Sequence, residues 1–306
     1  MKILVTGGAG YIGYSFVRSL LASSAPVREV VVYDNLSRKN YNLFLAPPFP
    51  GNEKLRFVSG ELLDNRKLEQ TLQNVDVVFH LAARVTTPYA DQDAHSFEQI
   101  NHWGTAALVD AVERAGTGTF VFLSSTSVYG SSEVSLDEQA PLSPQSFYGT
   151  SKMRAEQQVE RLKAMANTFI IRAGNVYGHN PVARFDAVIN RFMFEAHFNN
   201  RITVQGDGEQ MRAFIHVDKI AQVLTGLLES PVPAGTYNAV EHNFAVNDAV
   251  NAIRKIYPEV EVMHINRQVK MNAISIDTPC KIFEFLPMPK KDFEQELKDF
   301  KRAFAF

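Results

Sequence analysis

Near its start the chain reads Ile3-Leu-Val-Thr-Gly7-Gly-Ala-Gly10-Tyr-Ile-Gly13, an apolar run followed by a glycine-rich turn. Its short apolar run predicts a β-strand, and the apolar residues at 16–21 recur at helical spacing. Gly7 permits a tight turn, Gly10 lets the backbone approach a phosphate, and Gly13 allows the helix to pack closely on the strand. Because the first turn of such a helix has free N–H groups, the stretch predicts a pyrophosphate site.

A carboxylate ends the second apolar run. Asp34 lies about 20 residues after Gly13, where an acid can accept both hydroxyls of an adenosine ribose. The same charge repels a 2′-phosphate, so we expect NAD rather than NADP as the cofactor. Arg38 leaves an alternative open because it could reach a phosphate, although an arginine in an exposed loop is the commoner explanation.

Short apolar runs alternate with helical patterns at residues 3–6, 30–33, 55–58, 75–81, 119–124 and 168–171. Continuous apolar strands indicate burial on both faces, so we predict a doubly wound parallel α/β sheet of the Rossmann type. After residue 172 the rhythm loosens, which indicates a smaller α/β C-terminal substrate lobe. Because 214–228 resemble one more strand and helix, we expect a NAD-binding domain of 1–175 with 213–240 and a lobe of 176–212 with 241–306.

Two further segments have simple structural explanations. Residues 40–52 contain Pro47, Pro48 and Pro50, which predicts a surface loop. Near the C-terminus, apolar residues recur at helical spacing amid mixed charges, which predicts an amphipathic helix that covers a core. Those residues are Phe293, Leu297, Phe300 and Phe304.

The composition excludes several classes of protein. The chain has 306 residues, 45% of them hydrophobic, and its 31 Lys and Arg nearly balance 33 Asp and Glu. This predicts a globular protein without a nucleic-acid or membrane partner. A single cysteine, Cys280, cannot form an internal disulfide, and no apolar run approaches the roughly 18 residues of a membrane span, so we expect a cytoplasmic location. The eight histidines form no metal-ligand motif, and His80 and His216 are interpreted as core or pocket-wall residues.

A tyrosine and a lysine lie one helical turn apart in Tyr148-Gly-Thr-Ser-Lys152. An ammonium at that spacing would stabilise the phenolate and bring the pKa of Tyr148 into range for proton transfer at neutral pH. Upstream, Leu123-Ser-Ser-Thr-Ser-Val-Tyr-Gly130 leaves a predicted strand as a hydroxyl-rich loop. Together these features indicate oxidation of an alcohol beside a nicotinamide.

The chain resembles, over essentially its full length, an extended short-chain dehydrogenase/reductase of the NAD-dependent epimerase/dehydratase family. The glycine turn, the serine loop and the Tyr148/Lys152 pair carry the resemblance, with Asp34-Asn-Leu-Ser37, Gly60-Glu-Leu-Leu-Asp64, His80-Leu-Ala-Ala83, Asn101-His-Trp-Gly-Thr105, Arg172-Ala-Gly-Asn-Val-Tyr-Gly178 and 206–217. It implies that Tyr148 accepts and donates a proton, that Lys152 modulates its pKa, and that Ser125, or next Thr126, binds the reacting hydroxyl. The cofactor-binding set that it implies is Gly7, Gly10, Tyr11, Ile12, Gly13, Asp34, Asn35, Glu61, Leu62, Leu81, Ala82, Ala83, Asn101, Ser124, Tyr148 and Lys152.

The resemblance also implies a nucleotide-sugar substrate. Arg212 and Arg267 match positions that hold its diphosphate, which suits the forked donors of arginine, and Asn175 and Asn190 could bind phosphate or base. A surface ion pair is the alternative for Arg212, and the match of Arg267 is loose. Helical patterns at 97–115 and 147–164 resemble the pair that forms a homodimer interface in this family, although burial within one subunit also explains them.

Some positions depart from the family pattern. Members that dehydrate carry Asp and Glu where this chain has Thr126 and Ser127, and a neutral hydroxyl is a poor acid for a departing hydroxyl, so 4,6-dehydration is disfavoured. Glu61 replaces the usual Asp of the adenine pocket, and Ala213 and Lys219 replace acids beside Arg212, so substrate preference is expected to differ.

The sequence therefore predicts a NAD-dependent nucleotide-sugar 4-epimerase that acts on a UDP-sugar through a transient 4-keto sugar. The same site could instead serve a nucleotide-sugar decarboxylase, a 4-keto reductase or a 3,5-epimerase. A non-catalytic dinucleotide sensor is a third alternative, which the presence of Tyr148, Lys152 and Ser125 opposes.

Overall fold

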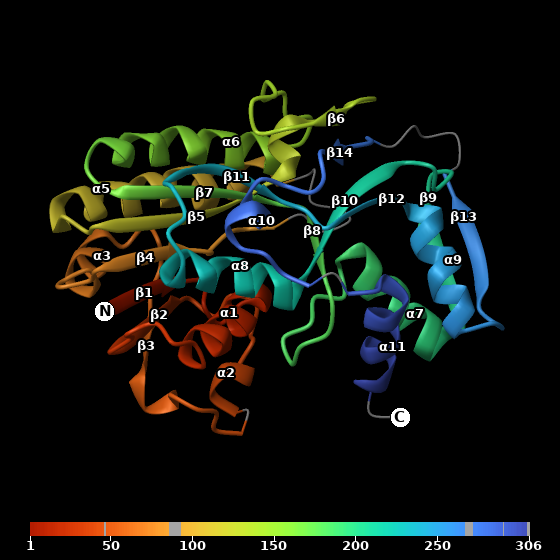
Figure 1. Cartoon of the computed structure of the whole chain (residues 1–306), viewed down its shortest axis with the longest axis horizontal. Helices are drawn as coiled ribbons and strands as arrows, with labels where there is room; N and C mark the ends of the chain where they lie inside the picture. The colour runs from red at the N-terminus through yellow and green to blue at the C-terminus, as the bar shows by residue number, and fades with distance from the viewer. Residues whose placement is uncertain (46, 86–92, 267–271, 290, 305–306) are drawn as a thin grey trace.

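A seven-stranded parallel sheet forms the centre of the main body (Figure 1). The computed structural model describes all residues except 46, 86–92, 267–271, 290 and 305–306. The strands are β1 (Lys2–Thr6), β2 (Glu29–Asp34), β3 (Leu55–Ser59), β4 (Val77–His80), β5 (Thr119–Ser125), β7 (Asn167–Ala173) and β11 (Gly235–Ala239). Their order is β3-β2-β1-β4-β5-β7-β11, and every neighbouring pair is parallel. The predicted doubly wound α/β fold is confirmed.

Helix layers cover both faces of the sheet because successive strand residues point to opposite sides. Ile3 and Val5 of β1 pack in one core with α1 (Tyr11–Leu21) and α8 (Val217–Glu229). Leu4 packs in the other core, which is formed with α3 (Asn65–Thr71), α5 (Gly104–Ala115) and α6 (Phe147–Val159). Both faces of the inner strands are buried, as in β1, β4 and β5, and this burial explains the continuous apolar runs in the sequence.

A smaller group of elements lies beside the sheet, on the right in Figure 1. It contains β8 (Asn175–Tyr177), α7 (Val188–Asn199), β9 (Arg201–Gln205), β10 (Met211–His216), β12 (His242–Ala245), α9 (Val246–Ile256), β13 (Glu261–Ile265) and α11 (Phe293–Arg302). β12, β10 and β8 form one sheet, β13 pairs with β9, and the helices enclose a separate apolar core. The division into 1–175 with 213–240 and 176–212 with 241–306 stays a proposal.

The return of the chain to the main sheet differs from the prediction. The helix expected within 214–228 is α8, and it packs against α1, but β10 pairs with β8 and β12 outside the main sheet. The strand that joins the sheet is β11, beside β7. It does so because α8 runs back across the sheet, so the strand after it enters parallel to β7.

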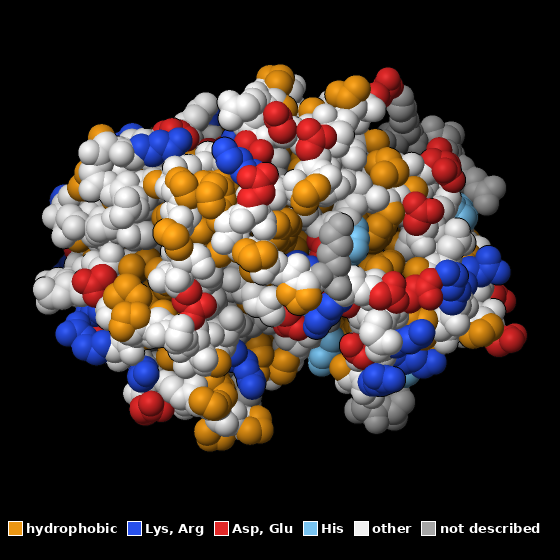
Figure 2. All heavy atoms as spheres, viewed as in Figure 1, with side chains coloured by type: hydrophobic (Ala, Val, Ile, Leu, Met, Phe, Trp, Pro, Cys, Tyr) orange, Lys and Arg blue, Asp and Glu red, His pale blue; other side chains and the backbone are white. Residues whose placement is uncertain are grey.

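Residues 40–52 are not the simple surface loop that the prolines predict. They contain a one-turn helix, α2 (Asn42–Leu45), and both Leu43 and Phe49 are buried in the core that includes α1. Phe44 and Leu45 of this segment are exposed. Figure 2 shows hydrophobic side chains at the lower edge of the molecule, where Figure 1 places α2. The predicted C-terminal amphipathic helix is confirmed as α11, which buries Leu297 and Phe300.

The remaining elements are short. They are β6 (Ser135–Leu136), β14 (Ser275–Ile276), α4 (Ala94–Phe97), α10 (Ile282–Phe285), a π-helical turn, Glu98–Trp103, and the 3₁₀ turns Asn52–Lys54, Thr126–Tyr129 and Glu160–Ala164. Among the described residues, none of the helices has the length and apolar character needed to cross a membrane.

Candidate active site

The glycine turn makes a cradle at the carboxyl end of β1. Gly7 has φ +72°, and a Cβ there would lie 2.5 Å from the backbone nitrogen of Ala82. A Cβ on Gly13 would lie 2.3 Å from the carbonyl oxygen of Gly7. Gly10 precedes α1 and offers no side-chain cap, so the first-turn N–H groups of the helix are free to meet an anion. The turn therefore fits a pyrophosphate.

A cavity of about 540 Å³ opens at this cradle. The predicted cofactor-binding residues that line it are Gly7, Gly10, Tyr11, Ile12, Gly13, Asp34, Asn35, Glu61, Leu62, Leu81, Ala82 and Ala83. The Asp34 carboxylate accepts N–H bonds from Ala9 (3.1 Å) and Leu36 (2.8 Å), which fix it at the end of β2. Burial raises the pKa of Asp34, against these two hydrogen bonds. A carboxylate in this place suits a ribose diol, so the residues present fit NAD.

The side chains of two predicted cofactor ligands face elsewhere. Asn101 is buried, and its amide bonds the backbone of Arg84 and the hydroxyl of Ser151. Ser124 is buried, and its hydroxyl donates to Glu156 Oε1 at 2.5 Å. Because both side chains are enclosed by protein, they support the walls of the site in this structure rather than contacting a cofactor.

The predicted proton-transfer group lies at the start of α6. Ser146 caps this helix by accepting the N–H of Gly149 at 3.0 Å, which places Tyr148 in the first turn. Gly149 has no room for a side chain, since a Cβ would lie 2.6 Å from the carbonyl oxygen of Ser127. The close approach brings α6 against the serine loop, where the side chain of Ser125 lowers the pKa of the Tyr148 phenol. Thr126, the next candidate, is buried in the 3₁₀ turn.

Lys152 shares the buried face of α6. Its Nζ donates to the carbonyl oxygen of Leu123 at 2.6 Å and lies 4.0 Å from the ring centroid of Phe122. Burial lowers the pKa of Lys152 to about 7, and the nearby carboxylate of Glu156 opposes that shift. The ammonium is therefore only partly populated at neutral pH.

The electrostatics of Tyr148 differ from the prediction. Burial raises the pKa of its phenol, and the cation that opposes this is Arg184, followed by the Ser125 hydrogen bond. Lys152 is not among the groups that shift the pKa of Tyr148 in this structure, where its Nζ is directed at the carbonyl oxygen of Leu123. The pattern in the sequence contained no signal for Arg184, which lines the cofactor cavity and whose Nε donates to Asp186 at 2.8 Å.

Arg212 and Asn175, two of the four predicted substrate ligands, lie on the paired strands β10 and β8. Burial lowers the pKa of Arg212, and its side chain has no hydrogen bond or ion pair within the described parts of the chain. Its expected alternative, a surface ion pair, is therefore absent there. Asn175 is exposed, and its amide donates to the carbonyl oxygen of Ala213 at 3.0 Å. Arg267 lies outside the described residues.

Asn190 is the clearest correction. It is fully buried, and its amide accepts the N–H of Gly178 and donates to Tyr11 Oη and to the carbonyl oxygen of Arg184. With its hydrogen bonds taken by protein groups, it joins the glycine turn to the segment after β8 and does not reach a substrate. The Tyr11 hydroxyl donates to the carbonyl oxygen of Gly178 at 2.5 Å and completes this link.

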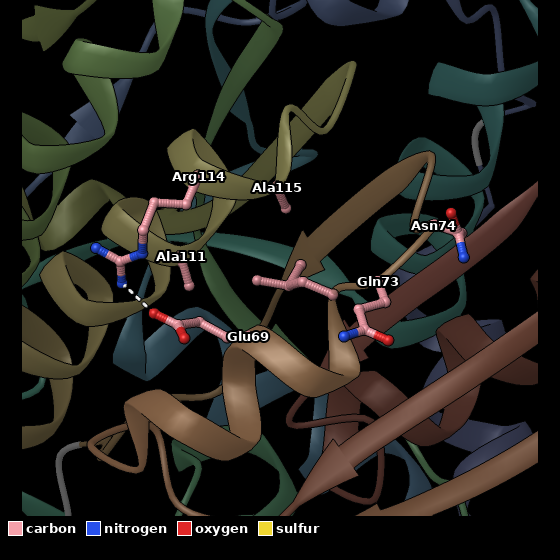
Figure 3. Close-up of a pocket in the computed structure, with 7 residues that line it drawn as sticks. Glu69, Gln73, Asn74, Ala111, Arg114 and Ala115 are labelled. Carbon is pink, nitrogen blue, oxygen red and sulfur yellow. Dashed lines mark ion pairs between the residues drawn. The ribbon is translucent and has the colours of Figure 1, made fainter.

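A second hollow, of about 450 Å³, lies between α3 and α5 (Figure 3). Figure 3 shows Arg114 and Glu69 facing each other at this place, with Arg114 NH2 and Glu69 Oε1 2.9 Å apart. In a parallel α/β sheet the helices run antiparallel to the strands, so the carboxyl ends of α3 and α5 lie at the amino ends of the strands. The glycine turn lies at the opposite edge, at the carboxyl end of β1. This hollow is not part of the candidate site.

Comparison with known proteins agrees with the fold and the cavity. The chain belongs to the NAD dependent epimerase/dehydratase family, whose model matches residues 3–240. It is therefore an enzyme of a nucleotide-sugar epimerase/dehydratase family, and NAD is its cofactor.

Its relatives include both kinds of enzyme. It is 31% identical to dTDP-D-glucose 4,6-dehydratase of Mus musculus over 78% of this chain and 67% of that protein. It is also 31% identical to a putative UDP-glucose 4-epimerase of Methanocaldococcus jannaschii, over 72% of this chain and 71% of that protein. The structure of DesIV, a dTDP-glucose 4,6-dehydratase of Streptomyces venezuelae with NAD bound, superposes with a TM-score of 0.83 at 28% identity and covers 99% of this chain and 96% of that one.

Proposed function

We propose that this chain is a NAD-dependent nucleotide-sugar 4-epimerase that acts on a UDP-sugar through a transient 4-keto sugar. The observation that carries the proposal is an intact group of Tyr148, Ser125 and Lys152 beside a turn whose Thr126 and Ser127 have hydroxyls where dehydratases need carboxylic acids. Such a site can move a proton and bind an alcohol, but it lacks a strong acid for a departing hydroxyl.

NAD, when bound, supplies a hydride acceptor and donor. In the proposed cycle, Tyr148 removes the proton of the C4 hydroxyl while Ser125 hydrogen-bonds the same oxygen, and Tyr148 returns that proton when the carbonyl is reduced. Arg184 favours the phenolate against the effect of burial. Arg212 holds the diphosphate, about which the keto sugar turns to present its other face. The buried guanidinium of Arg212 leaves its forked donors available for that anion.

The test is a panel of UDP-glucose, UDP-galactose and their uronic and N-acetyl relatives, followed by proton NMR in D₂O. Epimerisation inverts C4 with no net change in NADH and with no solvent deuterium in the sugar. Absence of C4 inversion with every sugar would refute the proposal. Carbon dioxide release, net NADH consumption or deuterium at C3 and C5 would instead identify the decarboxylase, reductase or 3,5-epimerase.

Similarity to dTDP-glucose 4,6-dehydratases favours dehydration as the second candidate. That reaction yields a 4-keto-6-deoxy sugar and incorporates deuterium at C5, so the same spectra distinguish it. If wild-type protein dehydrates, the argument from Thr126 and Ser127 is wrong. If it does not, acids introduced by Thr126→Asp with Ser127→Glu test whether those positions are what prevents it.

We also propose a homodimer formed by α5 and α6. These helices lie side by side on one face of the molecule (Figure 1), and Trp103 and Phe147 are exposed near their starts. Sedimentation that finds only monomer at micromolar concentration would contradict this assembly.

A further inference from the structure

A buried ion pair joins α6, the helix that bears Tyr148 and Lys152, to strand β7. The guanidinium of Arg172 donates two hydrogen bonds to the carboxylate of Glu156 in a bidentate ion pair. The distances are 3.1 Å from Nε to Oε1 and 2.8 Å from Nη2 to Oε2. The side chains are only 8% and 5% exposed, respectively. Desolvation of such a pair offsets most of its attraction, so stability alone is a weak reason for it to be present.

Glu156 also reaches the strand that bears the reacting hydroxyl. Its Oε1 accepts the hydroxyl of Ser124 at 2.5 Å, and Ser124 directly precedes Ser125 at the end of β5. On its own helix, Glu156 lies one turn after Lys152, whose Nζ is anchored on the neighbouring carbonyl oxygen of Leu123. One carboxylate thus connects β5, α6 and β7 at the place where the proposed proton-transfer group is assembled.

The charges around Lys152 show why that carboxylate matters. Burial lowers the pKa of Lys152 to about 7 even though the carboxylate of Glu156 opposes the shift. His80 faces it from β4, but burial lowers the pKa of His80 to about 3, so this imidazole is neutral. Tyr148, on the same helix, is protonated because burial raises its pKa, and Arg172 lies beyond Glu156.

We propose that Glu156 is a positioning residue for the reaction: held by Arg172, it keeps Lys152 protonated and keeps Ser124 and Ser125 in place against α6. The ammonium is the form that assists the phenolate and binds a ribose hydroxyl, so Glu156 acts on the reaction through Lys152. This inference rests on the proposed function, because it explains how Lys152, one of the residues assigned to that function, stays protonated.

The test is Glu156→Gln, which retains the shape of the side chain and removes its charge. Without the carboxylate, Arg172 is an uncompensated cation near Lys152, so the pKa of Lys152 falls by about one unit. Activity requires the ammonium. At pH 8, which is above the pKa of Lys152 in both proteins, the ammonium fraction and therefore kcat fall about tenfold in Glu156→Gln. Glu160→Gln is the matched control, since Glu160 pairs with Lys163 at 2.7 Å on the exposed side of the next turn.

The Lys152 pKa is read directly by carbon-13 NMR of the Nζ-bearing carbon in NAD-loaded protein. This readout needs no sugar substrate, so a failure to epimerise any sugar refutes the proposed function without deciding the role of Glu156. Arg172→Gln is the second variant. This change keeps the Glu156 carboxylate and removes the Arg172 cation that pairs with it. The carboxylate then stabilises the Lys152 ammonium more strongly, so the pKa of Lys152 should rise. An unchanged Lys152 pKa in folded Glu156→Gln overturns the proposal; if that variant does not fold, the absence of a rise in Arg172→Gln overturns it.

Discussion

Replacing Gly13 with alanine tests the geometry of the cofactor cradle. A Cβ there would lie 2.3 Å from the carbonyl oxygen of Gly7 and 2.6 Å from the Cα of Gly8, both of them backbone atoms. Ordinary contact begins at 3.4 Å, so α1 must move away from the turn by about 1 Å. Overpacking of this kind costs about 1–3 kcal/mol, whereas alanine within a helix gains about 1 kcal/mol over glycine.

We therefore expect Gly13→Ala to lose at most about 2 kcal/mol of stability while NAD affinity falls by at least about tenfold, because the displaced N–H groups no longer converge on the pyrophosphate. Calorimetric titration with NAD measures the affinity, and thermal melting measures the stability. Gly118→Ala is the matched control: it precedes β5 at the opposite edge of the sheet, and its Cβ would meet only the carbonyl oxygen of Asp76, at 3.9 Å. If Gly13→Ala binds NAD as tightly as wild type, this account of the cradle is wrong.

Three further changes separate the proposed roles. Tyr148→Phe removes the phenol hydroxyl and should lower kcat by at least about 100-fold with NAD still bound, as shown by turnover and native mass spectrometry; full activity would exclude Tyr148 as the proton carrier. Arg212→Gln should raise KM for the nucleotide sugar about tenfold or more and leave NAD binding unchanged, whereas an unchanged KM would remove Arg212 from the diphosphate site. Arg184→Gln should shift the acid limb of the kcat profile to higher pH, because its charge lowers the pKa of Tyr148 and the phenolate is the active base; a limb that stays in place would contradict that role.

Local signals were sufficient for the fold and for the glycine turn with its neighbouring carboxylate. Gly13 packs against the backbone of Gly7 and Gly8, and the Asp34 carboxylate accepts the N–H groups of Ala9 and Leu36, so these arrangements can be inferred from spacing in a single βαβ unit. The apolar runs of the central strands were equally informative, because a strand that is buried on both faces must be apolar throughout.

The tertiary structure decided which polar side chains reach the site. Ser124 and Asn190 are polar and lie close in sequence to predicted ligands, yet Glu156 and Tyr11, which are distant in the chain, occupy their hydrogen bonds. Arg184 acts on Tyr148 from a segment with no helical or strand pattern. A sequence shows which hydrogen-bonding groups are available, but only packing decides which of them are paired inside the protein and which stay open to a ligand.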